Sequence, residues 1–315
     1  MNDKVNRAYG PKKTAIVTGA NSGVGFETAI GLAKSGFKVV MACRNLDKAE
    51  KARASIQARY PDADLEVGEL DLGRFDSVRA FADRFRGQHA QLNILVNNAG
   101  ILDYSGRRTE AGLELQLATN HLGHFLLTSL LIDMMPDEPG SRVVSLSSIA
   151  HTKGKIAFDD LNCERPPDKG FAYAQSKLAC LMFSDELDRR LKQADRKLLS
   201  LCAHPGGTDS GLFDDMSRLR YYTLKLLAPL ITHSNEEAAR PILLAALSTD
   251  IRGGEYFGPQ GFMDLKGPPG PAARTEYSKN ADIAARLWEA SEELVGESFS
   301  LDELRGARLQ ASPGR

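Results

Sequence analysis

Short apolar segments alternate with segments of helical periodicity along the first two thirds of this 315-residue chain. The apolar segments are 14–17, 38–43, 65–70, 94–96, 142–146 and 198–203, and the helix-patterned segments between them are 24–35, 46–60, 75–86, about 112–131 and about 171–193. Strands that are apolar on both faces need cover on both faces, which excludes half-exposed hairpins. The alternation predicts an α/β fold, a single-domain doubly wound parallel sheet (Rossmann fold) with helices on both faces.

The pattern breaks after the sixth apolar segment. Residues 204–234 interrupt it before a helix at 235–247, a glycine- and proline-rich stretch surrounds a short strand at 256–257, and a last helix covers about 281–295. In a doubly wound fold the segment beyond the sixth strand overhangs the ligand site, so we expect 204–234 to form a lid. We expect one domain over 13–300, with polar ends at 1–12 and 301–315.

Charge and cysteine content exclude several classes of function. Lysine and arginine number 40 against 41 acidic residues, so the chain has no field to hold a polyanion, and we expect no nucleic-acid partner. The four cysteines are scattered without the paired spacing of a zinc or dithiol site, so we expect reduced thiols and no metal.

Neither the first residues of the chain nor its apolar stretches indicate a membrane. Residues 1–12 lack the apolar core of a signal peptide. The apolar stretches 122–135 and 221–231 are interrupted by polar or glycine residues and are shorter than the roughly 20 residues of a membrane-spanning helix. We expect a cytoplasmic protein without a membrane span.

A glycine-rich turn follows the first predicted strand. Gly19, Gly23 and Gly25 stand where that strand meets the first helix. Glycine lets backbone approach a pyrophosphate, and the N-terminus of a helix supplies free N–H groups and the positive end of its dipole. Many strand-to-helix loops use glycine for structure alone, but the position on the first strand of an alternating chain favours a nucleotide site.

The end of the second strand indicates which dinucleotide binds. A carboxylate there would bond a free ribose 2′-hydroxyl, whereas an arginine accommodates a 2′-phosphate. This strand ends at Arg44, with no acid in that position. Asp47 is a competing candidate, but a helix N-terminus explains an acid there without a ligand. The sequence therefore favours NADP(H) over NAD.

Tyr173 and Lys177 lie four residues apart in the long helix predicted at 171–193. Residues at this spacing share one helix face, so the phenol and the ammonium can reach one cavity. A nearby cation favours the phenolate, which suits a tyrosine for acid/base work. Such pairs are common on surface helices, and the nucleotide site upstream is what favours a catalytic role.

With these residues together, the chain closely resembles the short-chain dehydrogenase/reductase superfamily over about 12–300. The resemblance rests on three motifs: the turn 18–25, the segment Asn97-Asn98-Ala99-Gly100, and the Tyr173/Lys177 pair. Finer features, including the segments 42–44, 120–125, 147–151 and 204–206 and the 25 residues from Ser148 to Tyr173, resemble the retinol-dehydrogenase-like branch.

The resemblance implies a role for each matching residue. It assigns catalysis to Tyr173 as acid/base and to Lys177, which also binds the nicotinamide ribose. Ser148 would bond the substrate oxygen, with its neighbour Ser147 as second candidate. Asn120 would hold a water of the proton relay. It assigns cofactor binding to Gly19, Asn21, Ser22, Gly23, Val24, Gly25, Arg44, Asp71, Leu72, Asn98, Ala99, Gly100, Tyr173, Lys177, Pro205, Gly206 and Ser210. Asn97 would stabilise the sheet near the cofactor.

These expectations together describe an NADP(H)-dependent oxidoreductase that interconverts a hydroxyl with a ketone or aldehyde. Apolar residues within 211–231 suggest a bulky lipophilic or aromatic small-molecule substrate, although they could equally pack beneath the lid or at a subunit interface. The resemblance implies a homodimer or homotetramer formed through the long helices. One alternative is a catalytically silent NADP(H)-binding sensor or interaction protein of the same fold. Another is a light-driven reductase related to chlorophyll synthesis, but the motif 97–100 counts against it.

Overall fold

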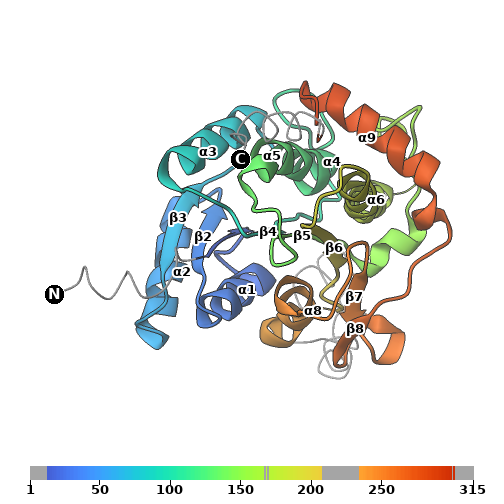
Figure 1. Ribbon diagram of the computed structural model, residues 1–315. Helices are drawn as coiled ribbons and strands as arrows, with labels where there is room; N and C mark the ends of the chain where they lie inside the picture. The colour runs from blue at the N-terminus through green and yellow to red at the C-terminus, as the bar shows by residue number, and fades with distance from the viewer. Residues whose placement is uncertain (1–12, 167, 169, 208–233, 300, 302–315) are drawn as a thin grey trace, which may run out of the picture.

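The computed structural model describes residues 13–166, 168, 170–207, 234–299 and 301 (Figure 1). Eight strands form one sheet in the order β3-β2-β1-β4-β5-β6-β7-β8. The first seven pair in parallel, and β8 pairs antiparallel with β7 at one edge. The predicted doubly wound α/β fold is confirmed, with an antiparallel edge strand that the sequence pattern did not predict.

The elements follow the predicted alternation. The strands are β1 (Thr14–Thr18), β2 (Lys38–Cys43), β3 (Leu65–Glu69), β4 (Ile94–Asn97), β5 (Arg142–Leu146), β6 (Leu199–Ala203), β7 (Tyr256–Pro259) and β8 (Pro269–Pro271). The α-helices are α1 (Gly23–Lys34), α2 (Leu46–Arg59), α3 (Phe75–Gln88), α4 (Leu115–Leu117), α5 (Gly123–Leu131), α6 (Phe171–Gln193), α8 (Asn235–Leu247) and α9 (Ala281–Val295). The short helices are η1 (Ala118–Leu122), η2 (Ile132–Met134), η3 (Ile149–Lys153), η4 (Phe262–Asp264) and η5 (Tyr277–Lys279). The predicted N-terminal segment 1–12, most of the lid, and all but one residue of the tail lie outside the described residues.

Helices cover both faces of the sheet, as wholly buried strands require. Ile16 and Val40 pack on the face covered by α3, α5 and α6, whereas Ala15, Val17 and Val39 pack on the face covered by α1, α2 and α8 (Figure 1). The result is a three-layer molecule in which the central strands are out of contact with water.

One predicted helix is divided. The sequence pattern indicated one continuous helix over about 112–131, but helix begins at Leu115 and passes through the π-helical turn η1 before α5. Gly112 has a left-handed backbone (φ +78°), and the Glu114 carboxylate caps the helix by accepting the N–H of Leu117. In η1 the N–H of Gly123 donates to the carbonyl of Ala118, five residues back. Thr119 of this turn lines the functional cleft, and Asn120 lies behind its wall.

The sheet order creates the place for a ligand. The chain adds β2 and β3 on one side of β1 and then returns to add β4 on the other side. The connections leave β1 and β4 in opposite directions, which opens a crevice at the carboxyl ends of these strands, where doubly wound proteins bind ligands.

Candidate active site

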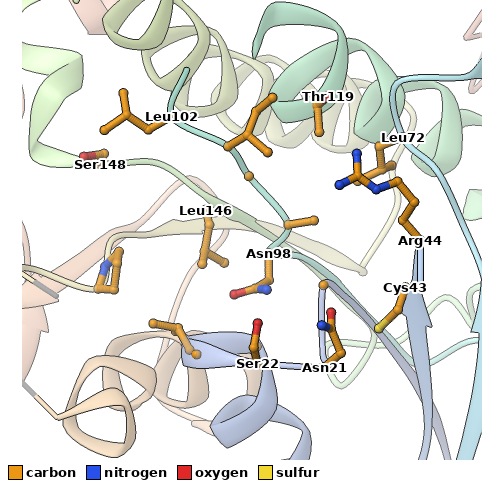
Figure 2. A pocket seen from close by; sticks show the side chains of 18 of the residues that line it. Asn21, Ser22, Cys43, Arg44, Leu72, Asn98, Leu102, Thr119, Leu146 and Ser148 are labelled. Carbon is orange, nitrogen blue, oxygen red and sulfur yellow. The ribbon is translucent and has the colours of Figure 1, made fainter. Parts of the chain in front are cut away.

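A cleft of about 740 Å³ runs along the carboxyl ends of the central strands (Figure 2). Segments far apart in the sequence meet there: the glycine turn after β1, the ends of β2 to β5, the start of α6, and the turn after β6. The predicted site residues that line it are Gly19, Asn21, Ser22, Gly23, Val24, Gly25, Arg44, Asp71, Leu72, Asn98, Ala99, Gly100, Ser148, Tyr173, Lys177, Pro205 and Gly206. Asn120 lies behind the wall of the cleft, and Ser210 lies outside the described residues.

The turn after β1 needs its glycines because backbone segments pack closely there. A Cβ on Gly19, whose φ is +68°, would lie 3.1 Å from Ala99. A Cβ on Gly25 would lie 2.4 Å from Asn98 Nδ2 and 2.5 Å from the Gly19 carbonyl oxygen. Asn98 fixes this contact, since its Nδ2 donates to the Thr18 carbonyl at 2.7 Å. The turn is therefore held tightly against the end of β4.

The N-terminus of α1 is suited to an anion. Its N-cap, Ser22, makes no side-chain capping bond, and the first turn of the helix carries no acidic residue. Figure 2 shows Ser22 and Asn21 at the edge of the cleft below Asn98. Free N–H groups and the helix dipole make such an end a phosphate site.

Arg44 lines the cleft directly after β2. In Figure 2 its side chain rises from the end of the strand toward Leu72. Its guanidinium has no ion pair and no hydrogen bond to any part of the chain that the structure describes. Asp47, the competing candidate, lies in the first turn of α2 and does not line the cleft. A guanidinium at this place can pair with an anionic group of a bound dinucleotide.

Asp71 and Leu72 form the neighbouring wall at the end of β3. Asp71 Oδ1 accepts the N–H of Gly73 at 3.0 Å, and the Asp71 N–H donates to Ser77 Oγ at 3.0 Å. Burial raises the pKa of the adjacent Cys43 thiol to about 11, so this wall carries a neutral thiol.

Tyr173 and Lys177 occupy one face of α6, and the Lys177 ammonium lies 6.0 Å from the centre of the Tyr173 ring. Lys177 is buried, and its Nζ donates to the Leu146 carbonyl at 3.1 Å. A Cβ on Gly100 would come within 3.0 Å of that Nζ, so glycine at this position lets the ammonium lie beneath the end of β4.

Ser147 and Ser148 at the end of β5 have different partners. The Ser147 hydroxyl is buried and donates to the Lys177 carbonyl at 2.8 Å. Ser148 Oγ accepts the N–H of Ala150 at 3.2 Å, which leaves its proton available toward the cleft. Ser148 is therefore the serine that can donate to a substrate oxygen.

Asn120 braces the wall instead of lining the cleft. Its Oδ1 accepts the Ile101 N–H at 2.8 Å, and its Nδ2 donates to the Ile101 carbonyl and to Ser176 Oγ at 3.0 and 2.9 Å. The neighbouring amide, Asn97, donates to Thr128 Oγ1 at 3.0 Å. The relay role of Asn120 that the resemblance implies stays a prediction.

The turn after β6 closes the cleft beside Ser148. Gly206 has φ +78°, and a Cβ there would lie 2.5 Å from the Leu265 carbonyl oxygen and 2.7 Å from Pro259. This turn is therefore packed against the β7–β8 connection.

Several lining residues were not among those predicted. They are Ala42, Cys43, Leu70, Ile101, Leu102, Tyr104, Thr119, Leu146 and Ser147 as a wall residue. Most adjoin a predicted motif at a strand end, which was the available signal. Thr119, in the π-helical turn η1, adjoins no strand end and had none.

Two features are absent from the residues that the structure describes. These residues contain no helix long and apolar enough to cross a membrane. They also contain no group of three or more histidine, cysteine, aspartate or glutamate side chains arranged to hold a metal ion.

Relatives of known structure share this architecture. A crystal structure of an uncharacterized protein from Mycobacterium paratuberculosis superimposes with a TM-score of 0.76 at 40% identity, over 92% of this chain and 95% of that one. L-sorbose reductase from Gluconobacter frateurii, solved with NADPH and L-sorbose, has a TM-score of 0.60 at 21% identity over 78% of this chain and 94% of its own. At that identity the second comparison shows the fold alone.

Sequence relatives agree. Human retinol dehydrogenase 13 is 38% identical over 300 residues, covering 92% of this chain and 87% of the relative. Bovine retinol dehydrogenase 12 is 40% identical over 287 residues, covering 90% and 86%. The model of the short chain dehydrogenase family matches residues 13–218. Fold, cleft and relatives lead to one conclusion: the chain belongs to the short-chain dehydrogenase/reductase family, in its retinol-dehydrogenase-like branch, whose members are nicotinamide-dependent oxidoreductases of hydroxyl and carbonyl groups.

Proposed function

We propose that this protein is an NADP(H)-dependent oxidoreductase that interconverts a hydroxyl and a ketone or aldehyde on a bulky, lipophilic small molecule, with Tyr173 as acid/base. The observation that carries the proposal is the convergence of Ser148, Tyr173 and Lys177 on the cleft that also contains the glycine turn. A carbonyl reduction needs a hydride donor, a proton donor and a group that holds the developing alkoxide.

The chain's own residues supply two of these three requirements. The Ser148 hydroxyl donates to the substrate oxygen and fixes its position, and Tyr173 gives that oxygen a proton during reduction or removes it during oxidation. The buried Lys177 ammonium stabilises the negative charge that develops on the phenol oxygen when the proton leaves. Bound NADP(H) would supply or accept the hydride.

Arg44 supports the choice of NADP(H). A guanidinium that lines the cleft without a partner among the described residues can pair with a 2′-phosphate, and the end of β2 has no acid for a free 2′-hydroxyl. Asn21 and Ser22 also line the cleft, at the open N-terminus of α1.

Apolar side chains support a lipophilic substrate. Ile101, Leu102 and Tyr104 line the cleft, and Leu102 and Tyr104, at 36% and 40% exposed, are among the few exposed large apolar side chains of the described residues. Figure 2 shows Leu102 near Ser148. The names of the relatives, retinol dehydrogenases 12 and 13, support a long apolar alcohol or aldehyde.

The test of cofactor choice is a fluorescence or calorimetric titration with NADPH and NADH on the wild type and on Arg44→Ala. A charge-assisted hydrogen bond contributes about 1.5–3 kcal/mol, so we expect NADPH to bind at least about tenfold more tightly than NADH and the substitution to abolish that advantage. Arg53→Ala is the matched control, because Arg53 pairs with Glu50 on α2 outside the cleft. Equal or tighter binding of NADH by the wild type would refute the assignment.

A further inference from the structure

A buried histidine behind the cleft has no part in the proposed reaction. His124 is 3% exposed and lies in the first turn of α5, directly after the π-helical turn η1. A buried imidazole needs partners for both ring nitrogens. His124 has both, and each partner adjoins a residue that lines the cleft: Thr18 precedes Gly19, and Asn120 follows Thr119.

The partners determine the form of the ring. His124 Nδ1 lies 2.9 Å from the Asn120 carbonyl oxygen, which can only accept, so Nδ1 carries a proton. His124 Nε2 lies 2.8 Å from Thr18 Oγ1. That hydroxyl oxygen already accepts the N–H groups of Asn98 and Ala99, each at 2.9 Å. Its own proton can go to Nε2 at 2.8 Å or to the Val96 carbonyl at 3.4 Å, and the shorter contact favours Nε2.

Burial agrees with a neutral ring. It lowers the pKa of His124 to about 4, with a smaller contribution in the same direction from the positive charge of Lys177. Around neutral pH the ring therefore keeps one proton and one acceptor nitrogen. The hydrogen bonds place that proton on Nδ1.

Thr18 is the contact on the cofactor side. It ends β1 immediately before Gly19, and its carbonyl accepts Asn98 Nδ2 at 2.7 Å. The hydroxyl and the carbonyl of Thr18 thus join the end of β1 to the residues directly after β4. His124 fastens this junction to α5.

Asn120 is the contact on the catalytic side. Its carbonyl also accepts the Cys180 thiol of α6 at 3.1 Å, and its side chain bonds Ile101 and Ser176. A carbonyl oxygen has two lone pairs, and His124 and Cys180 supply two donors. Asn120 is thereby held to the helix that carries Tyr173 and Lys177.

We propose that His124 is a positioning residue of this enzyme: its neutral, Nδ1-protonated imidazole joins Thr18 to Asn120 and keeps the cofactor turn in register with the Tyr173–Lys177 helix. The inference rests on the proposed function for its effect on turnover. Its effect on cofactor binding and the form of the ring are measurable without turnover.

Two substitutions each remove one partner of the hydrogen bond between His124 and Thr18. His124→Phe keeps a ring but removes both nitrogens, and Thr18→Val keeps the shape of the side chain but removes the hydroxyl. Thr18→Ser retains that hydroxyl. Ser200→Ala is the matched control, because it removes a buried hydroxyl that bonds Ser184 away from the cleft.

We expect His124→Phe and Thr18→Val each to raise the dissociation constant for NADPH about tenfold or more, as the loss of a buried hydrogen bond predicts. The double variant should be little worse than Thr18→Val alone, because the valine already removes the link to His124 together with the acceptor of the Asn98 and Ala99 N–H groups. Thr18→Ser and Ser200→Ala should bind NADPH as the wild type does. At saturating NADPH a weaker affinity for the cofactor no longer limits the rate. Even there, we expect the kcat of His124→Phe to lie below that of the wild type.

Three results would overturn the proposal: wild-type affinity and kcat in both single variants, strictly additive effects in the double variant, or an equal loss in Ser200→Ala. Nitrogen NMR of the histidines in the wild-type protein tests the same idea without a variant that has to fold. We expect a neutral Nδ1–H tautomer for His124, and a neutral Nε2–H form or an imidazolium near neutral pH would refute it. If the wild type binds NADPH but turns over no carbonyl, the proposed function fails while these measurements still decide the role of His124.

Discussion

Adjacent serines at the end of β5 differ in what their hydroxyl groups can do. Ser147 is committed to the Lys177 carbonyl, whereas Ser148 keeps its proton for the cleft. The sequence alone named Ser148 first through the resemblance and left Ser147 as a second candidate. The hydrogen bonds give a physical reason for the same preference.

We predict that Ser148→Ala lowers kcat by about 10²–10³-fold, because it removes a donor to the developing alkoxide. Ser147→Ala should cost stability, about 1 kcal/mol for one buried hydrogen bond, with a much smaller effect on kcat. Steady-state kinetics at saturating cofactor, with unfolding curves for both variants, check this. A collapse of kcat in Ser147→Ala beside a nearly normal Ser148→Ala would reverse the assignment.

At the scale of elements, the C-terminal helix α9 covers the long helices that were expected to meet another subunit. Trp288 of α9 is 2% exposed, and its ring lies 5.0 Å from Phe125 of α5 and 5.8 Å from Phe183 of α6, between ring centres. The guanidinium of Arg190 lies 4.4 Å over the same indole. The homodimer or homotetramer stays a prediction, and the surface under α9 is closed to a partner.

We predict that Trp288→Ala destabilises the protein by about 3–5 kcal/mol, because it leaves a large cavity among aromatic rings. Trp288→Phe should lose considerably less, since a ring remains in contact with Phe125 and Phe183. Denaturant unfolding measures both. A loss below about 1 kcal/mol in Trp288→Ala would show that α9 contributes little to the core.

The helix elements also show where sequence patterns stop being informative. Apolar periodicity located α5 and its end, but it could not reveal the π-helical turn η1. The contacts of that turn come from Ile101 and Ser176, distant in sequence. Strand β8 consists of Pro-Gly-Pro, a composition that disfavours strands except at an edge, where it pairs with β7.

At the scale of the whole molecule, the sheet and the position of its cleft were predictable. Parallel strands joined by right-handed crossovers bring their carboxyl ends to one edge, so motifs at those ends had to meet. Residues such as Leu102 and Thr119, which reach the cleft through loop or helix geometry, carried no signal of their own. The place of Asn120 behind the wall, bonded to Ile101 and Ser176, also needed the three-dimensional contacts.

With the proposed function, a lipophilic carbonyl bound in this cleft would receive a hydride from NADPH and a proton from Tyr173. The direct test follows oxidation of NADPH by the wild type and by Tyr173→Phe, with retinal and with small polar ketones as substrates. We expect turnover with the wild type, a clear preference for the lipophilic aldehyde, and a loss of at least about 10²-fold in kcat for Tyr173→Phe with NADPH binding retained. Full activity in Tyr173→Phe, a preference for the small polar set, or NADPH binding without any turnover by the wild type would contradict the account.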